Sequence, residues 1–460
     1  MRKLNDAPAR SGGQYVLYWC RWNRRAESNH ALAFASLLAN RLGVPLLFFE
    51  NLSCSDPCDN LRMHTFVLEG IPETEANVRG LGIGYVFHLA RRKDERVPLP
   101  ALLREAAAFV TDDYPFALSA RPYNELPETL DVQSYAVESS CVVPPACIGQ
   151  RSYAAYSIRP KIHKLLPQYL KPVPSVNVEH RFPIGATALH TEVRKQQIPA
   201  LAASCEIDCG VPPSTSIRGG RAEANRRLKR FLHHRLRRYA REKNEPAAHA
   251  TSGLSPHLHF GQISSLEVAL AAQRCAQEHK LVADEFLEEL IVRRELAFNF
   301  AWHSRRVDNL DELPDWARDT LRAHRKDKRD PVYTREQFES GATADALWNA
   351  TQKELLLRGV IHGYYRMYWG KKILEWSATP REALATMIHL HDRYALDGRD
   401  PNTYANILWC FGLHDRPWPE RPVYGTVRSM SLAGMERKTD VAAYIKEIEF
   451  LERTGKELTT

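Results

Sequence analysis

Three tryptophans in the C-terminal half have the spacing that electron transfer between aromatic side chains requires. Trp369 and Trp376 are seven residues apart in a helical pattern, which places them on one face, two turns and roughly 10 Å apart. Trp348 belongs to the helical segment before them. Indole rings at such distances can pass an electron from one to the next, but an aromatic stripe at helical spacing is more often core. Taken alone, the pattern therefore favours core aromatics over an electron relay.

A bend rich in hydroxyl side chains precedes a predicted helix within the segment TSGLSPHLHFGQIS, residues 251–264. Hydroxyls and free backbone N–H groups at such a bend are suited to binding a pyrophosphate. Clusters of Ser, Thr, Gly and Pro are also common in ordinary loops, so this alternative stays open. The bend is formed by Thr251, Ser252, Gly253, Leu254 and Ser255.

Basic residues gather in two places. Residues 218–243 contain eleven Lys and Arg against two acidic residues, and Arg428, Arg437 and Lys438 form a second group. The whole chain carries a formal charge of only +8, so contact with nucleic acid depends on such clusters rather than on the total charge. Duplex phosphates are bound by charge of this kind, although a run of charge is usually a solvated face.

The composition is that of an ordinary soluble protein of 460 residues, with 44% hydrophobic and 26% charged residues. No apolar run approaches the roughly 18 residues of a membrane span, and the N-terminus lacks the apolar stretch of a secretory signal. We therefore expect a cytoplasmic protein. The nine cysteines show no paired CxxC spacing, so we expect structural thiols in a reducing compartment and assign no metal ligands, with a zinc or iron–sulfur site as the weaker alternative.

Strands and helices alternate in residues 14–150, which predicts a Rossmann-like α/β domain with a parallel sheet. No GxGxxG motif follows the first strand, so a dinucleotide is not expected at the usual place on this sheet. Ser28 is a plausible cap for the first helix, which Gly43 would end. The apolar runs that predict the strands lie at 15–19, 46–49, 85–89, 109–113 and 135–139.

Periodicity is lost over residues 151–215, where frequent prolines indicate an interdomain linker along the surface. Helical spacing then dominates residues 216–460 and strands do not return, so we expect an all-helical second domain. A loop-rich region from 397 to 440 should close it. Its long helical segments are predicted at 264–279, 284–303, 345–376 and 380–394.

Several long motifs in the helical half resemble those of a known family. They are FLEELIVRREL (286–296), RMYWGKKILEW (366–376), RYALDGRDPN (393–402) and HDRPWPERPVYGTVRSM (414–430). In this order they resemble the catalytic domain of the class II cyclobutane pyrimidine dimer photolyases, members of the photolyase/cryptochrome family. The resemblance covers most of the chain, including the 251–264 segment and, more loosely, the helix NHALAFASLLANRLG near the N-terminus.

The resemblance implies that FAD binds in a bent conformation within the helical domain. A salt bridge beside its isoalloxazine ring matches Arg366 and Asp397, and a buried arginine needs such a carboxylate partner. The three tryptophans match the chain that carries electrons to the flavin in light. The matching cofactor-binding positions are Tyr239, Thr251 to Ser255, Asp397, Gly398 and Arg399.

The same resemblance places Glu289 against a damaged pyrimidine pair and Met367 and Trp409 in the substrate pocket. A carboxyl group beside an apolar plane suits a flipped-out dimer, although a helix-surface charge is the plainer reading of Glu289. We group Arg293, Arg428, Arg437 and Lys438 with the residues that contact DNA.

The implied activity is repair of DNA, in which light-excited reduced FAD donates the electron that splits the cyclobutane ring. His391 stands where the family has an asparagine facing the flavin, and it is either a residue that acts beside the ring or a tolerated variant at that position. Gly363 and Ser429 also depart from the family pattern. These changes leave open a cryptochrome-like photoreceptor with little or no repair activity. We further expect a monomer, and an antenna pigment in the N-terminal domain would be a folate or a deazaflavin.

Overall fold

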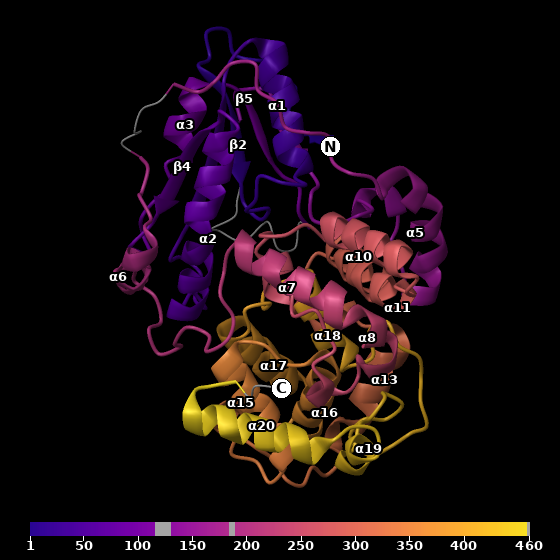
Figure 1. Ribbon diagram of the computed structural model, residues 1–460. Helices are drawn as coiled ribbons and strands as arrows, with labels where there is room; N and C mark the ends of the chain where they lie inside the picture. The colour runs from indigo at the N-terminus through magenta and orange to yellow at the C-terminus, as the bar shows by residue number, and fades with distance from the viewer. Residues whose placement is uncertain (116–129, 184–188, 458–460) are drawn as a thin grey trace.

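The computed structural model describes residues 1–115, 130–183 and 189–457. Its first part is a six-stranded sheet of order β1-β6-β5-β2-β3-β4 (Figure 1). Neighbouring strands are parallel except β1, which is antiparallel to β6. The predicted parallel α/β sheet is therefore confirmed. The strands are β1 (Arg2–Lys3), β2 (Tyr15–Cys20), β3 (Leu46–Leu52), β4 (Gly84–Leu89), β5 (Ala106–Asp112) and β6 (Ser134–Val137).

Helices cover both faces of this sheet. Successive side chains of each buried strand point to opposite faces, and since nearly all of them are apolar, both faces must be shielded from water. On β2, Val16 and Tyr18 belong to a core that also contains residues of α1 and α2, whereas Leu17 and Trp19 belong to a core completed by α3. The bounds of these helices are α1 (His30–Leu42), α2 (Leu61–Gly80) and α3 (Leu99–Glu105).

The first helix begins one residue later than the sequence suggested. Asn29, not Ser28, caps α1, and its side chain accepts a hydrogen bond from the backbone N–H of Leu32. Ser28 has a φ of 47°, which is incompatible with the extended backbone of a capping residue. Gly43 ends the helix as expected, with a left-handed φ of 67°.

Residues 151–215 contain more regular structure than a linker. The helix α5 (Ala155–Tyr169) forms in spite of Pro160 and Pro167. It buries Ile158 and Ile162 in a core shared with the helical domain, whereas the short helix α6 (Ile198–Ala203) packs in a core of the sheet domain. The two ends of this segment therefore belong to different domains.

The remainder of the chain is helical, as predicted, and none of the described helices is long and apolar enough to cross a membrane. The helix α20 (Val441–Thr454) runs across the end of the domain far from the sheet (Figure 1). The other helices are α7 (Arg221–His234), α8 (Leu236–Glu242), α9 (Ser255–His259), α10 (Ser265–His279), α11 (Asp284–Leu287), α12 (Arg294–His303), α13 (Asp315–Ala323), α14 (Arg335–Ser340), α15 (Ala346–Arg358), α16 (Gly363–Trp376), α17 (Pro380–Tyr394), α18 (Pro401–Trp409) and α19 (Leu432–Glu436).

Two sequence predictions for this domain need correction. The single helix expected over 345–376 is two helices, because Gly359 adopts a φ of 77° and ends α15. A side chain there would approach both Arg62 and Leu396 to 3.1 Å. The loop-rich region 397–440 contains α18 and α19, whose short apolar stretches gave too little helical period to be recognised.

One buried arginine joins the two domains. Arg62, on α2 of the sheet domain, donates to the carbonyl oxygens of Leu355 at 3.0 Å and Tyr394 at 2.8 Å. It also donates to the carbonyls of Pro212 and Leu356. Three of these carbonyls belong to the last turns of α15 and α17, where carbonyl groups lack partners within the helix.

Candidate active site

A cavity of about 950 Å³ lies in the helical domain, near the upper end of the range for small-molecule sites. Its wall combines the hydroxyl bend before α9 with residues of α15, α16, α17 and α18, which the sequence places far apart. The predicted site residues that line it are Tyr239, Thr251, Ser252, Gly253, Leu254, Ser255, Glu289, Arg366, Met367, Trp369, His391 and Asp397.

Arg366 and Asp397 form the predicted salt bridge at the cavity wall. Nη2 of Arg366 donates to the two carboxylate oxygens at 3.0 and 2.9 Å. Burial by itself would raise the pKa of Asp397, but the Arg366 guanidinium outweighs burial and lowers it. The pair is therefore ionised. The Nε atom of Arg366 is buried and has no hydrogen-bond partner among the described residues.

His391 lines the cavity, and one of its ring nitrogens is buried without a partner among the described residues. Its Nδ1 lies 3.0 Å from the carbonyl oxygen of Met387, and a carbonyl only accepts, so Nδ1 carries the proton. Burial, and next the charge of Arg366, lower the pKa of His391 to about 4. The imidazole is thus neutral, and its Nε2, which has no partner among the described residues, is an acceptor.

Cations surround the hydroxyl bend at another part of the wall. Arg235 donates to the carbonyl oxygen of Thr251 at 3.0 Å, and Nη1 of Arg227 lies 3.2 Å from the position of a Cβ on Gly253. Burial and then three neighbouring arginines lower the pKa of Arg235 to about 10. A bound anion would relieve this repulsion. The bend with Arg227 and Arg235 is suited to a diphosphate.

Sequence reasoning missed Arg227 and Arg235 because it treated residues 218–243 as a surface for DNA. Their separation of eight residues, about two helical turns, was the available signal. Several other cations of this segment are paired locally, as Arg221 is with Glu267 at 2.6 Å and Arg226 with Glu223 at 2.7 Å. The segment is therefore not a bare basic face.

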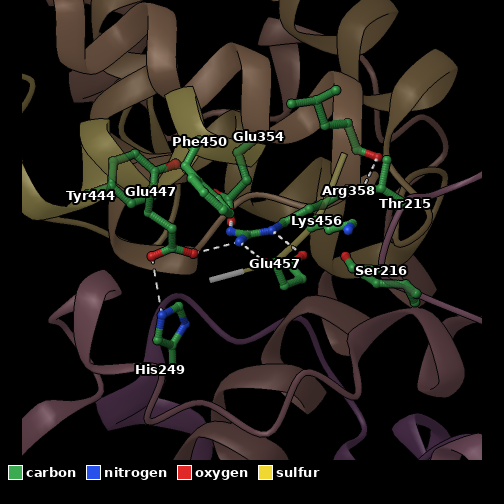
Figure 2. A network of polar contacts seen from close by, with 12 residues as sticks. Thr215, Ser216, His249, Glu354, Arg358, Tyr444, Glu447, Phe450, Lys456 and Glu457 are labelled. Carbon is green, nitrogen blue, oxygen red and sulfur yellow. Dashed lines mark hydrogen bonds and ion pairs between the residues drawn. The ribbon is translucent and has the colours of Figure 1, made fainter. Parts of the chain in front are cut away.

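Charged groups at a further part of the cavity wall satisfy one another (Figure 2). Arg358 at the end of α15 bonds to Glu354 at 3.0 Å, to Glu447 at 2.5 Å and to Glu457 at 2.9 Å. Glu447 also lies 3.2 Å from His249. Burial would lower the pKa of Arg358, but the three carboxylates outweigh it and raise it. This network fixes α20 to the cavity wall.

The three predicted tryptophans form a contiguous row that starts at the cavity. Trp369 lines the cavity and stacks on Trp348, with ring centroids 6.1 Å apart and planes at 4°. Trp348 in turn lies 6.3 Å from Trp376. Trp348 therefore fills the space between the two residues of α16. Trp376 is 7% exposed, whereas the other two are fully buried.

Glu289 lies at the cavity edge on an irregular helical turn. Residues Glu288–Arg293 form a π-helical segment between α11 and α12, and such segments often occur at functional sites. The Glu289 carboxylate is 42% exposed and accepts a hydrogen bond from Nζ of Lys243 at 2.8 Å. Met367, from α16, lines the same cavity. A carboxylate and an apolar surface are thus available to a ligand at this edge.

Comparisons with known proteins agree with this geometry. The DNA photolyase family model matches residues 16–178. The deoxyribodipyrimidine photo-lyase of Methanothermobacter thermautotrophicus is 36% identical, with 98% of both chains covered. That of Arabidopsis thaliana is 37% identical, covering 95% of this chain and 89% of the relative. That of Potorous tridactylus is 35% identical, covering 96% and 83%. The chain belongs to the photolyase family.

Solved structures of the photolyase family share the fold. A class III photolyase from Agrobacterium tumefaciens superposes with a TM-score of 0.69 at 17% identity, covering 98% of this chain and 94% of that one. A cryptochrome from Synechocystis superposes with a TM-score of 0.67 at 15% identity, covering 96% and 90%. At these identities the likeness extends to the architecture only.

Photolyases bind FAD, and the cavity fits such a group. Besides its volume and the cations at the hydroxyl bend, its wall carries three buried polar atoms without a partner among the described residues: Nε of Arg366 and Nε2 of His362 and His391. Buried polar atoms are nearly always hydrogen-bonded. These atoms are therefore the expected contacts of a polar ring system, and Arg227 and Arg235 beside the hydroxyl bend those of its phosphates.

Besides Trp348 and Trp376 of the tryptophan row, seven of the predicted site residues lie outside the cavity wall. The side chain of Arg399 points to the sheet domain, where its Nη1 bonds to Asp59 at 3.0 Å. The geometry therefore does not support its predicted role in binding the cofactor. Gly398 allows close packing, because a Cβ there would lie 2.5 Å from the carbonyl oxygen of His391. The others are Arg293, Trp409, Arg428, Arg437 and Lys438.

Those remaining residues fall into two groups. Trp409 and Arg428 lie together, with the guanidinium 5.6 Å from the indole centroid, and Arg428 pairs with Asp415 at 3.2 Å. Arg293, Arg437 and Lys438 are exposed, and Arg293 is 3.4 Å from Glu288. Of the departures from the family pattern, Gly363 lines the cavity and its missing side chain faces open space.

Proposed function

We propose that this chain is a deoxyribodipyrimidine photo-lyase, which uses light to split cyclobutane pyrimidine dimers in DNA. The observation that carries the proposal is the similarity of 35 to 37% over nearly the full length to three proteins of that name. The cavity supports it independently, since it offers a site for a flavin nucleotide and a carboxylate at its edge.

FAD would be held by both ends of the cavity. The Thr251–Ser255 bend, with Arg227 and Arg235, would bind the diphosphate, and Arg366 and His391 would contact the ring system. Bound and reduced, FAD supplies light absorption and the electron for ring opening. The Arg366 guanidinium favours negative charge beside it, and Asp397 keeps that guanidinium in place.

His391 has a distinct role from the family's asparagine. An amide offers either a donor or an acceptor by reorienting, whereas the Nδ1 proton of His391 is committed to Met387. The imidazole can therefore only accept, at Nε2, a hydrogen bond from a ring N–H. With FAD bound, it would stabilise a protonated ring nitrogen of the cofactor and not a deprotonated one.

The substrate would be held at the cavity edge. Glu289 accepts hydrogen bonds from pyrimidine N–H groups, Lys243 orients that carboxylate at 2.8 Å, and Met367 provides an apolar contact. Exposed Arg437 and Lys438 supply charge for the phosphates of the damaged duplex.

The tryptophan row would reload the site with electrons. Trp376 reaches the surface and Trp369 reaches the cavity, with Trp348 in contact with both. Each indole is within about 6.3 Å of the next, so an external reductant can act without entering the cavity.

The monomeric state, the cytoplasmic location and a folate or deazaflavin antenna in the sheet domain complete the proposal. The antenna is tested by the chromophore that co-purifies with the protein. Release of a second pigment besides flavin on denaturation, identified by mass spectrometry, supports it, and release of flavin alone contradicts it.

Illumination of the purified, reduced protein with an oligonucleotide that contains one thymine dimer tests the activity. We expect light-dependent conversion to two thymines, resolved by chromatography, and no conversion in the dark. Glu289→Gln should lower the conversion about tenfold, equivalent to about 1.4 kcal/mol of barrier. Glu288→Gln is the matched control, because Glu288 pairs with Arg159 at 2.6 Å and lies outside the cavity wall. Binding of the dimer and reduction in light without any conversion would instead favour the cryptochrome-like photoreceptor.

A further inference from the structure

Three side chains with affinity for soft metals converge in the interior of the sheet domain. The sulfur atoms of Cys54 and Cys205 and one ring nitrogen of His64 all lie within 4.8 Å of one another. Cys54 follows β3, His64 is in the first turn of α2, and Cys205 follows α6. The exposed fractions of these residues are 1, 6 and 0% for Cys54, Cys205 and His64. The scattered cysteine spacing gave no sign of this cluster.

The backbone around this cluster is fixed by contacts that do not involve the three side chains. The N–H of Leu61 donates to the carbonyl of Asp208 at 3.1 Å, and the N–H of Asp208 donates to the carbonyl of Asp59 at 3.0 Å. Asn60 caps α2 by accepting from the N–H of Met63 at 3.1 Å. The chain segments that carry the two cysteines and the histidine are therefore held side by side in advance.

The imidazole of His64 is poorly satisfied by protein groups. Its Nε2 lies 3.9 Å from the Cys54 sulfur, the outer limit for a weak hydrogen bond, and its Nδ1 has no partner within the described parts of the chain. The Cys54 thiol has another acceptor, the carbonyl oxygen of Ala90 at 2.8 Å. A fully buried imidazole normally has a good hydrogen-bond partner. Hydrogen bonding within the protein therefore does not explain why His64 lies beside the two sulfurs.

We propose that Cys54, His64 and Cys205 bind one Zn²⁺ ion. Two thiolates and one imidazole are among the preferred ligands of zinc, and bonds of about 2.3 Å to sulfur and 2.0 Å to nitrogen place the ligand atoms roughly 3.5 to 3.8 Å apart. The three atoms reach that spacing with small rotamer changes. The fourth, tetrahedral position is left to an oxygen ligand, either water or the Ala90 carbonyl.

Charge selects a divalent ion over a monovalent one at this buried position. Binding forms two Zn–S bonds and one Zn–N bond, and each thiol loses its proton, so two protons are released for each ion bound. Two thiolates, a neutral imidazole and Zn²⁺ sum to zero charge, which is the least costly arrangement in an apolar interior. A disulfide between the cysteines would leave the position of His64 unexplained.

The site would strengthen the contact between the two domains. Asp59, between Cys54 and His64, and Asp208, three residues after Cys205, bind Arg399 and Arg393 of the helical domain at 3.0 and 2.8 Å. Zinc would fix the segments that carry these carboxylates. Removal of the metal should therefore lower the Tm of the whole protein without changing the flavin cavity itself.

Metal content of the purified, flavin-containing protein tests the proposal. We expect one zinc per chain by elemental mass spectrometry, release of two protons on reloading after chelation, and thiolate-to-metal charge-transfer bands when Co²⁺ replaces Zn²⁺. Cys54→Ser/Cys205→Ser should lose the metal and the bands. The control Cys58→Ser/Cys209→Ser changes two cysteines outside the cluster and should keep both.

Flavin content and circular dichroism verify that each variant is folded. If the double cysteine variant does not fold, X-ray absorption of the zinc-loaded wild type decides instead, with two sulfurs and at least one nitrogen expected around the metal. A wild type that binds no zinc at equimolar concentration would overturn the proposal, as would zinc retained in Cys54→Ser/Cys205→Ser. So would a Cys54–Cys205 disulfide in the isolated protein.

Discussion

The buried Asp112 carboxylate of the sheet domain and three buried nitrogens of the cavity wall differ in how fully they are hydrogen-bonded. In the sheet domain, one carboxylate oxygen of Asp112 accepts from the backbone N–H groups of Arg21 at 2.8 Å and Trp22 at 2.9 Å, and the other accepts from the Tyr18 hydroxyl at 2.8 Å. Around the cavity, buried nitrogens of Arg366, His362 and His391 lack partners within the described chain.

The contrast separates groups that complete the fold from groups that await a ligand. Asp112 fixes the end of β5 to the loop after β2, and nothing remains for it to bind. Each of the three cavity side chains has one nitrogen that is hydrogen-bonded within the protein and one that has no partner among the described residues. Since an unsatisfied buried donor or acceptor costs about 1 to 3 kcal/mol, such atoms are retained where a bound molecule recovers that free energy.

The largest expected effect comes from breaking the ionised pair at the cavity. Arg366→Met leaves the Asp397 carboxylate buried and alone, which should destabilise the protein by about 3 to 5 kcal/mol and abolish stoichiometric FAD. Asp112→Asn should lower the free energy of unfolding by about 1 to 3 kcal/mol and leave the FAD content unchanged. Flavin absorbance per chain and urea unfolding measure both. Equal loss of FAD in the two variants would contradict the contrast.

The second largest effect should be a loss of stability in acid, caused by the buried His391. The pKa of His391 is about 4 in the fold and about 6.5 in an unfolded chain, so the unfolded state binds more protons between these values. Stability is therefore complete above pH 6.5 and falls as the pH falls to about 4, by roughly 3 kcal/mol for this group. His391→Asn should flatten that part of the pH dependence of unfolding. The exposed His163→Asn serves as control, and an equal flattening there would refute the assignment.

The smallest effect concerns the tryptophan row. Trp369→Phe removes the indole between the cavity and Trp348, so flavin photoreduction by an external thiol should slow about tenfold, or about 1.4 kcal/mol in barrier. Bound FAD and stability should change little, since Phe fills most of the space. Trp316→Phe, outside the row and only partly buried, should reduce at the wild-type rate. Unchanged photoreduction in Trp369→Phe would exclude the row as the electron path.

Local patterns were sufficient to predict the sheet and most helices. The apolar runs gave the strands because each is buried on both faces. The helix α5 was missed because Pro160 and Pro167 normally exclude a helix, whereas tertiary burial of Ile158 and Ile162 stabilises it. The break at Gly359 follows from contacts with Arg62 and Leu396, which no local pattern contains.

The candidate site shows the same limit. Arg366, Asp397 and His391 could be expected from two motifs of the family resemblance, at 366–376 and around 393–402, each of which is continuous in the sequence. The bend at 251–255 acquires its charge from Arg227 and Arg235 only because α7 and α8 fold back over it. Arg399 lies in the same motif as Asp397, yet its side chain turns toward Asp59. Side-chain direction at a chain reversal is decided by the neighbouring domain and cannot be derived from spacing.

The arginine that joins the domains limits how this protein can be divided. The Arg62 guanidinium supplies donors to carbonyls at the ends of α15 and α17, and both helices carry cavity residues. A helical half produced without α2 would therefore begin to fray at the helix ends that shape its own binding site. The flavin-binding half should therefore not fold properly on its own. Exchange of sheet domains between relatives should succeed only where the incoming domain supplies a side chain that donates to the same helix-end carbonyls.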